Sequence, residues 1–120
     1  MVQGPLQTLV RRLHQIAGGS EEPSDRQLLQ RFATANDETA FAVLVRRYAG
    51  LVLGVCEHVL HNEADAEDAF QATFLILARK AATLPWRESV GGWLHEVAHR
   101  VALKARAERS RRHKWLHALG

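Results

Sequence analysis

The stretch that decides the fold is Asp65-Ala-Glu-Asp-Ala-Phe-Gln-Ala-Thr-Phe-Leu-Ile-Leu-Ala-Arg-Lys80, in which apolar side chains recur at helical spacing. One stripe has the pattern of a helix face that lies against a core. It consists of Ala66, Phe70, Thr73, Phe74, Leu77 and Ala81. We therefore predict a central helix over residues 63–81.

The same helix has a second apolar surface on its other side. Apolar side chains extend around the back and polar side chains recur beside them: Ala69, Ala72, Leu75 and Ile76, then Asp65, Asp68 and Gln71. A helix that is apolar nearly all round is either fully buried or covered by a partner on its second side. Full burial is hard to arrange in 120 residues, so we predict that this second face, with its acidic first turn, docks onto another macromolecule. An interior helix of a small bundle is the alternative.

The length and composition indicate one domain made of helices. A chain of 120 residues has room for one core and little more. Ala, Leu, Arg and Glu dominate, β-branched residues other than Val are few, and no alternating run is long enough for a convincing strand. We predict an all-α, single-domain helical bundle of about four helices with an N-terminal extension.

Start and stop signals divide the rest of the chain. Cap residues mark the expected helix starts: Ser24 or Asp25, Asn36-Asp37-Glu38, Asn62 and Ser89. The expected helices cover residues 24–35, 38–60 and 63–81, followed by a long final helix from residue 89 past Arg109. Residues 1–23 are expected to form an extension with a flexible joint, residues 24–113 the domain, and residues 114–120 a C-terminal tail.

Two details of the helix over residues 38–60 can also be predicted. Arg46 and Arg47 fall outside its apolar stripe, so we expect both to face outward. Gly50 and Gly54 lie four positions apart on one helix face, a spacing that more often reflects close helix packing than function.

Charge is distributed unevenly along the chain. Residues 1–90 hold nine Lys or Arg against eleven Asp or Glu, whereas residues 91–120 hold seven against two. A basic last quarter on a slightly acidic body indicates nucleic acid or another polyanion as partner. Cys56 is the single cysteine and is expected to be a buried small hydrophobe. No signal segment or membrane-spanning apolar run is evident, so we expect a cytoplasmic protein without a membrane partner.

The final helix carries cations opposite its core stripe. The expected core face is Leu94, Val97, Ala98, Val101 and Ala105, and the opposite side holds His95, His99, Arg100, Arg106 and His113, with Lys104 on the flank. Like charges this close repel each other unless an anion is present, and a phosphate backbone supplies that anion. Trp86 and Trp93 could each stack on unpaired bases for about 1–3 kcal/mol. The combination predicts binding to melted or single-stranded DNA; a solvated basic face, and a core position for Trp93, are the alternatives.

One short motif suggests an enzyme instead. His95-Glu-Val-Ala-His99 spells H-E-x-x-H, in which two imidazoles one turn apart can bind zinc and the glutamate acts as base. A catalytic zinc needs a third protein ligand, and the best remaining candidates, His113 and His117, lie in a basic tail. We therefore expect no metal, no cofactor and no enzyme activity, with a metalloprotease as the enzyme alternative.

Two stretches together resemble region 2 of bacterial extracytoplasmic-function sigma factors. They are Ala66-Glu-Asp-Ala-Phe-Gln-Ala-Thr-Phe-Leu75 and Gly92-Trp-Leu-His-Glu-Val-Ala-His-Arg-Val-Ala-Leu-Lys-Ala-Arg106. The opening segments Asp25–Phe32 and Ala40–Tyr48 are similar to the family's first helices. The resemblance covers about residues 24–112, with the motifs in the family's order and spacing.

The resemblance implies a transcription-initiation subunit that binds RNA polymerase core and that recognises and melts the promoter minus-ten element. The central helix is similar to the segment that grips the clamp helices of the largest polymerase subunit, through Asp65, Asp68, Gln71, Phe74 and Leu75. The loop from Leu84 to Ser89, with Trp86 and Arg87, resembles the part that captures a base flipped from the non-template strand. The final helix resembles the one that reads the minus-ten element, through Trp93, His95, His99, Arg100, Lys104, Arg106 and Arg109. An anti-sigma factor is a candidate regulatory partner.

The sequence also departs from the family pattern. Ala72 stands where the family often has an acidic residue, and Arg100 and Lys104 stand where it commonly has Asn and Asp. Region 4, the second domain that reads the minus-thirty-five element, is not found in the chain. The alternative function is a stand-alone basic helical DNA-binding or interaction module that does not engage polymerase.

Overall fold

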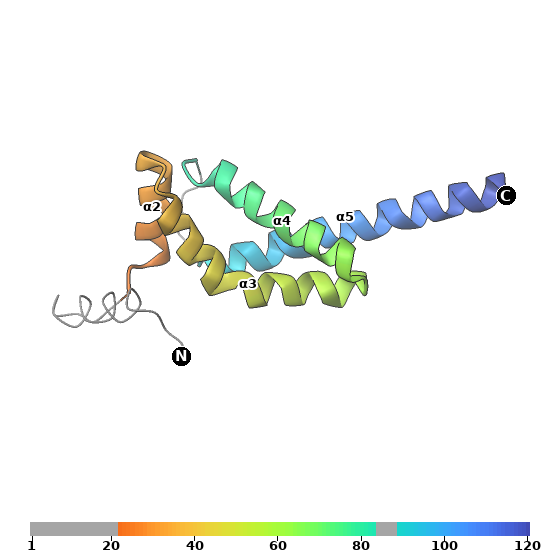
Figure 1. The fold of residues 1–120 in the computed structure, drawn as a ribbon, viewed down its shortest axis with the longest axis horizontal. Helices are drawn as coiled ribbons and strands as arrows, with labels where there is room; N and C mark the ends of the chain where they lie inside the picture. Colours follow the sequence, from red (N-terminus) through yellow and green to blue (C-terminus); the bar gives the residue numbers. More distant parts are fainter. Residues whose placement is uncertain (1–21, 84–88) are drawn as a thin grey trace.

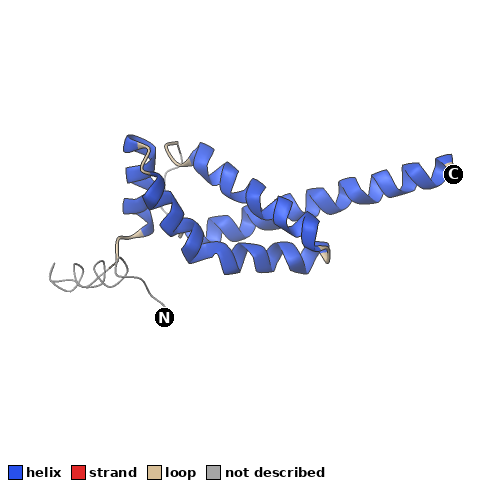
Figure 2. Cartoon of the chain, viewed as in Figure 1, coloured by secondary structure: helices blue, strands red, loops and turns tan. Residues whose placement is uncertain are grey.

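The computed structural model describes residues 22–83 and 89–120, and within them every regular element is an α-helix (Figure 2). The helices are α2 (Asp25–Ala35), α3 (Glu38–Leu60), α4 (Glu63–Lys80) and α5 (Val90–Leu119). Helix α3 packs against each of the other three, and α4 also packs against α5 (Figure 1). The predicted all-α bundle is confirmed.

Local capping explains where each helix begins. The side chains of Ser24, Asp37, Asn62 and Ser89 each accept a hydrogen bond from a backbone N–H in the first turn of the helix that follows. Each such cap typically contributes about 1 kcal/mol. Asn36 and His61 adopt left-handed backbone angles, with φ of 52° and 51°, which lets the chain reverse between consecutive helices within two residues. The predicted helix boundaries are confirmed to within about a residue.

The core lies between α3, α4 and α5 and is closed at one end by α2. Its largest fully buried side chains are Leu28, Leu29, Leu44, Leu77, Leu94, Val52, Thr73 and Cys56. Thr73 satisfies its hydroxyl by donating a hydrogen bond to the Ala69 carbonyl at 2.7 Å. Burial raises the pKa of the Cys56 thiol, with the Glu57 carboxylate adding a smaller effect in the same direction. Cys56 is thus the buried small hydrophobe that the pattern predicted.

The prediction that Arg47 faces outward is wrong. Its guanidinium reaches across to the start of α2, where Nη1 donates to Asp25 Oδ1 at 2.9 Å and Nη2 donates to the Pro23 carbonyl at 2.6 Å. Asp25 also accepts a hydrogen bond from the Tyr48 hydroxyl. Burial, followed by this hydrogen bond, raises the pKa of Tyr48 to about 12. Arg46, by contrast, is exposed as expected.

The prediction of close helix packing at the two glycines of α3 is also wrong. A Cβ placed on Gly50 or Gly54 would meet nothing within 4 Å, and both residues are exposed. Leu51, between them, is 42% exposed. None of the described residues packs on this side of α3, because α2, α4 and α5 lie against its other sides.

Helix α3 is long and apolar enough to cross a membrane by length and composition alone. A core helix of a soluble protein passes the same test. In this fold the other three helices pack against α3, and 22% of its apolar stretch is buried.

Helix α5 extends well beyond the bundle (Figure 1). Its buried residues, Val90, Leu94, Ala98 and Ala102, all lie in its first half. The helix continues without a break through residue 113, where the sequence suggested the start of a tail, and ends at Leu119. Past the residues that contact α4, the last turns of α5 project away from the other described helices (Figure 1).

Candidate functional site

The outward side of α4 combines exposed polar and apolar side chains in one line. Asp68, Gln71 and Leu75 are three or four positions apart, so they fall on the same helix face, and all three are exposed. Leu75 is 59% exposed, whereas Leu77, on the opposite face, is fully buried. Of the second apolar face predicted from the sequence, Leu75 is exposed, and Ala72 and Ile76 are half-buried. Ala69 was assigned to that face wrongly, because it lies in the core at 3% exposure.

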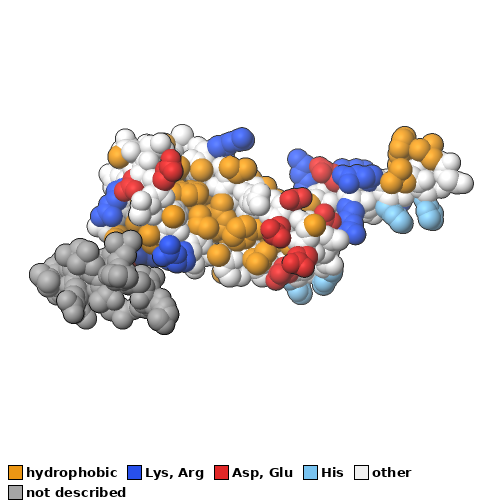
Figure 3. Space-filling view, viewed as in Figure 1, with side chains coloured by type: hydrophobic (Ala, Val, Ile, Leu, Met, Phe, Trp, Pro, Cys, Tyr) orange, Lys and Arg blue, Asp and Glu red, His pale blue; other side chains and the backbone are white. Residues whose placement is uncertain are grey.

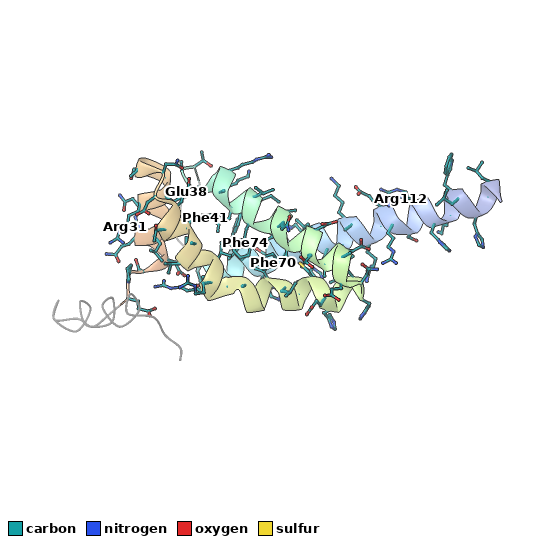
Figure 4. The ribbon with its side chains drawn as sticks, in the orientation of Figure 1. Arg31, Glu38, Phe41, Phe70, Phe74 and Arg112 are labelled. Atoms are coloured by element: carbon teal, nitrogen blue, oxygen red, sulfur yellow. The ribbon has the colours of Figure 1, made fainter. Side chains whose placement is uncertain are left out.

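Phe74 lies on the buried face rather than on this outward line. Its side chain is only 6% exposed, and its ring meets that of Phe70 edge-on, with the ring centroids 5.1 Å apart (Figure 4). A partner could reach Phe74 only by opening the core. The prediction of Phe74 as a contact residue is therefore not supported, because its helical position places it beside Thr73 and Leu77 in the interior.

Asp65 lies at the start of α4 and connects that helix to α5. Its backbone N–H donates to the Asn62 side chain at 2.9 Å, which fixes it in the first turn. Its carboxylate accepts a hydrogen bond from Arg109 Nη1 at 2.9 Å. Asp65 and Arg109, predicted for two different surfaces, are thus bonded to each other.

The part of α5 from Trp93 to Arg106 is basic on the side away from the core. Its predicted contact residues His95, His99, Arg100, Lys104 and Arg106 are all exposed. Trp93 is half-buried and packs against the core, so only part of its ring is available to a ligand. The structure thus leaves the cations of this helix open to an anion along several turns.

Trp86 and Arg87 lie outside the described residues. The helix that follows them is held at its first turn, because a Cβ on Gly91 would approach Tyr48 Cε1 to 2.9 Å. The Tyr48 ring is itself fixed by the bond to Asp25. Close contact between α3 and the start of α5 therefore sets the position of Trp93.

Substituting the two adjacent glycines should separate this close contact from helix propensity. Among the described residues, a Cβ at Gly92 meets only Ser89 Oγ at 3.7 Å, so we expect Gly92→Ala to stabilise the protein by roughly 0.5–1 kcal/mol, since alanine favours a helix over glycine. Gly91→Ala forces the Tyr48 ring to move and is expected to lower the melting temperature. Thermal unfolding of both variants followed by circular dichroism measures the difference, and equal stabilisation by the two would contradict the contact.

A shallow groove of about 710 Å³ runs between α4 and α5. Its α4 wall includes the carboxylates of Asp65 and Asp68, and its α5 wall includes Lys104, Arg109 and Arg112. Figure 3 shows acidic side chains gathered near the start of α4 and basic ones along the neighbouring part of α5. The sequence analysis missed Arg112 and this groove, because only the packing of the two helices brings the opposite charges together.

The end of α5 carries an exposed apolar cluster that the sequence analysis also missed. Trp115, Leu116 and Leu119 are 63%, 55% and 67% exposed. They follow the bundle-facing side of α5 past the point where the bundle ends, as helical spacing of apolar positions would have indicated.

His95 and His99 of the H-E-x-x-H string both lie on the exposed side of α5. Within residues 22–83 and 89–120, no three His, Cys, Asp or Glu side chains come together as a metal site would require. The string therefore lacks a third protein ligand in the part of the chain that the structure describes.

Comparison with known proteins matches these features to one family. The model of Sigma-70 region 2 matches residues 44–112, which includes α4, most of α3 and the basic part of α5. The chain belongs to this family. It is 28% identical over 91 residues to the RNA polymerase sigma-H factor of Pseudomonas aeruginosa, an alignment that includes 76% of this chain.

The chain spans about half the length of that relative, since the alignment covers 47% of it. No solved structure matches the chain.

Proposed function

We propose that this chain acts as region 2 of an extracytoplasmic-function sigma factor, in the cytoplasm and without a cofactor. It binds RNA polymerase core through α4 and recognises and melts the promoter minus-ten element through α5. The observation that carries the proposal is the exposed line of Asp68, Gln71 and Leu75 on a helix whose other face is buried, within a match to the Sigma-70 region 2 family.

The polymerase partner under this proposal is the pair of clamp helices of the largest subunit. Leu75 supplies an apolar contact, and the exposed acids of the first half of α4 attract cations on the partner. The exposed outer side of α4 needs no rearrangement to receive such a partner, because the core side of the helix is already filled.

The DNA contact under this proposal requires no bond chemistry. Arg100, Lys104 and Arg106 bind phosphates, which gives affinity that falls as salt rises. Trp86 and Arg87, which precede α5 in the sequence, capture a base that leaves the non-template strand, and stacking on the indole contributes about 1–3 kcal/mol. Binding energy spent on the separated strands shifts the equilibrium toward open promoter DNA.

Capture of bacterial RNA polymerase core by the purified chain tests the proposal. In a parallel experiment, fluorescence anisotropy measures the affinity of the same chain for forked minus-ten promoter DNA and for the closed duplex. Capture of polymerase together with preference for the forked DNA is the expected result. DNA binding without polymerase capture would instead favour a stand-alone basic DNA-binding module.

Neutralising the basic side of α5 should weaken DNA binding and reduce its dependence on salt. Arg100→Ala and Arg106→Ala each remove one exposed cation, so the slope of log affinity against log salt should fall by about one unit for each. Arg26→Ala, an exposed arginine on α2, is the matched control. Anisotropy titrations at several salt concentrations measure the slopes, and an equal effect of the control would argue against a contact specific to α5.

A further inference from the structure

Asp65 and Arg109 form an ion pair at a position where two proposed binding surfaces meet. Asp65 belongs to the α4 surface proposed for polymerase, and Arg109 belongs to the α5 surface proposed for DNA. Arg109 Nη1 lies 2.9 Å from Asp65 Oδ2, so the two charges are paired with each other in the free protein.

The pair is placed so that a partner can replace either member. The side chains of Arg109 and Asp65 are 54% and 36% exposed, so both are open to solvent. Water-exposed ion pairs of this kind are weak, so exchanging one partner for another costs little free energy. The neighbouring groove holds further charges of both signs, Asp68 and Glu108 with Lys104 and Arg112, so a displaced side chain finds new electrostatic partners nearby.

The pair also joins the projecting half of α5 to the bundle. The last fully buried residue of α5 is Ala102, two turns before Arg109. Asp65 is fixed on the bundle side by the cap of α4, through Asn62. The contact therefore lies at the point where α5 leaves the core.

We propose that this ion pair couples the two binding events. A cation of the polymerase that binds Asp65 releases Arg109 to bind a phosphate, and a phosphate that binds Arg109 releases Asp65. Each partner thus raises the affinity of the protein for the other by the same factor, as thermodynamic linkage requires. A pair this exposed can supply a factor of about two to five. This inference rests on the proposed function, since it assigns a regulatory contact to the same two surfaces.

Removing Asp65 tests the release of Arg109 without polymerase present. In the free chain at low salt, Asp65→Asn should bind forked promoter DNA about two- to five-fold more tightly than the wild type. Glu63→Gln is the control, because it removes one negative charge from the same exposed helix turn at a residue that forms no ion pair with another described residue. Equal gains from both variants would show a general electrostatic effect and overturn the coupling, and so would no gain from Asp65→Asn.

A second substitution locates the effect on the pair. In the Arg109→Gln background, Asp65→Asn should give no gain beyond that of Glu63→Gln, because there is no longer an arginine to release. In the reciprocal arm, Arg109→Gln should raise the affinity for polymerase core about two- to five-fold. Arg106→Gln, which removes an exposed cation that forms no ion pair within residues 22–83 and 89–120, should not. A persistent gain in the double variant, or no difference between the two arginine variants, would overturn the proposal.

The wild-type measurements keep this inference separate from the proposed function. If the wild-type chain binds neither polymerase core nor forked DNA, the proposed function fails. If it binds both and the variants behave like their controls, only the coupling fails.

Discussion

Asp68→Lys is expected to abolish capture of RNA polymerase core, while Glu57→Lys leaves capture unchanged. Both substitutions reverse one exposed carboxylate, but Asp68 lies on the outward line of α4 and Glu57 lies near the end of α3. A reversed charge facing a basic partner costs several kcal/mol. The affinity should therefore fall by at least about 100-fold, which corresponds to roughly 2.7 kcal/mol.

The measurement is a quantitative pull-down with immobilised polymerase core, and circular dichroism of each variant verifies the fold. The Asp68 side chain is exposed, so the substitution should not disturb the core. Equal capture by the Asp68 and Glu57 variants would remove α4 from the polymerase interface, even if the wild type still binds.

Leu77→Ala should cost the fold about 2–5 kcal/mol of unfolding free energy, the usual range for truncating a buried leucine. Leu77 is fully buried on α4 and Leu75, two residues before it, is 59% exposed. Leu75→Ala should therefore change stability by no more than about 0.5 kcal/mol, while it weakens polymerase capture. Comparing these two leucine-to-alanine variants therefore distinguishes the role of the exposed face of α4 from the role of its buried face.

Urea denaturation followed by circular dichroism measures the stability of both variants, and the pull-down measures their binding. The two-faced assignment of α4 would be wrong if Leu75→Ala destabilised the protein as much as Leu77→Ala. It would also be wrong if Leu75→Ala left polymerase capture at the wild-type level in a system where Asp68→Lys abolishes it.

The helices could be predicted from the sequence because local interactions determine their ends. Ser24, Asp37, Asn62 and Ser89 each cap a helix through a hydrogen bond to a residue three positions later. Such bonds depend only on residues close in sequence. The buried stripe of α4 could likewise be predicted from the sequence, because buried positions recur with the helical period.

The predictions that were wrong concern how the helices pack against one another. Arg47 was expected to face outward, but the start of α2 lies within its reach and supplies Asp25 and the Pro23 carbonyl. Gly50 and Gly54 fit a packing motif, yet none of the four described helices lies against them. Periodicity within one helix does not say which neighbour, if any, lies beside each face.

The candidate site shows the same limit. The exposure of Asp68, Gln71 and Leu75 follows from helical periodicity, whereas the 2.9 Å contact between Asp65 and Arg109 joins residues 44 positions apart. Phe74 is 6% exposed, because its helical position falls on the buried stripe of α4 rather than on the outward line. Whether these residues bind polymerase or DNA stays a prediction until the variants are measured.

The unbroken course of α5 has a mechanical consequence. Between Ala102, where the core ends, and Leu119 the helix rises by about 25 Å, at roughly 1.5 Å per residue. A tilt of about 10° at the bundle would therefore displace the Trp115 end by several ångströms. Small changes in how α5 packs against α3 and α4 would therefore produce larger displacements of any molecule bound to that end.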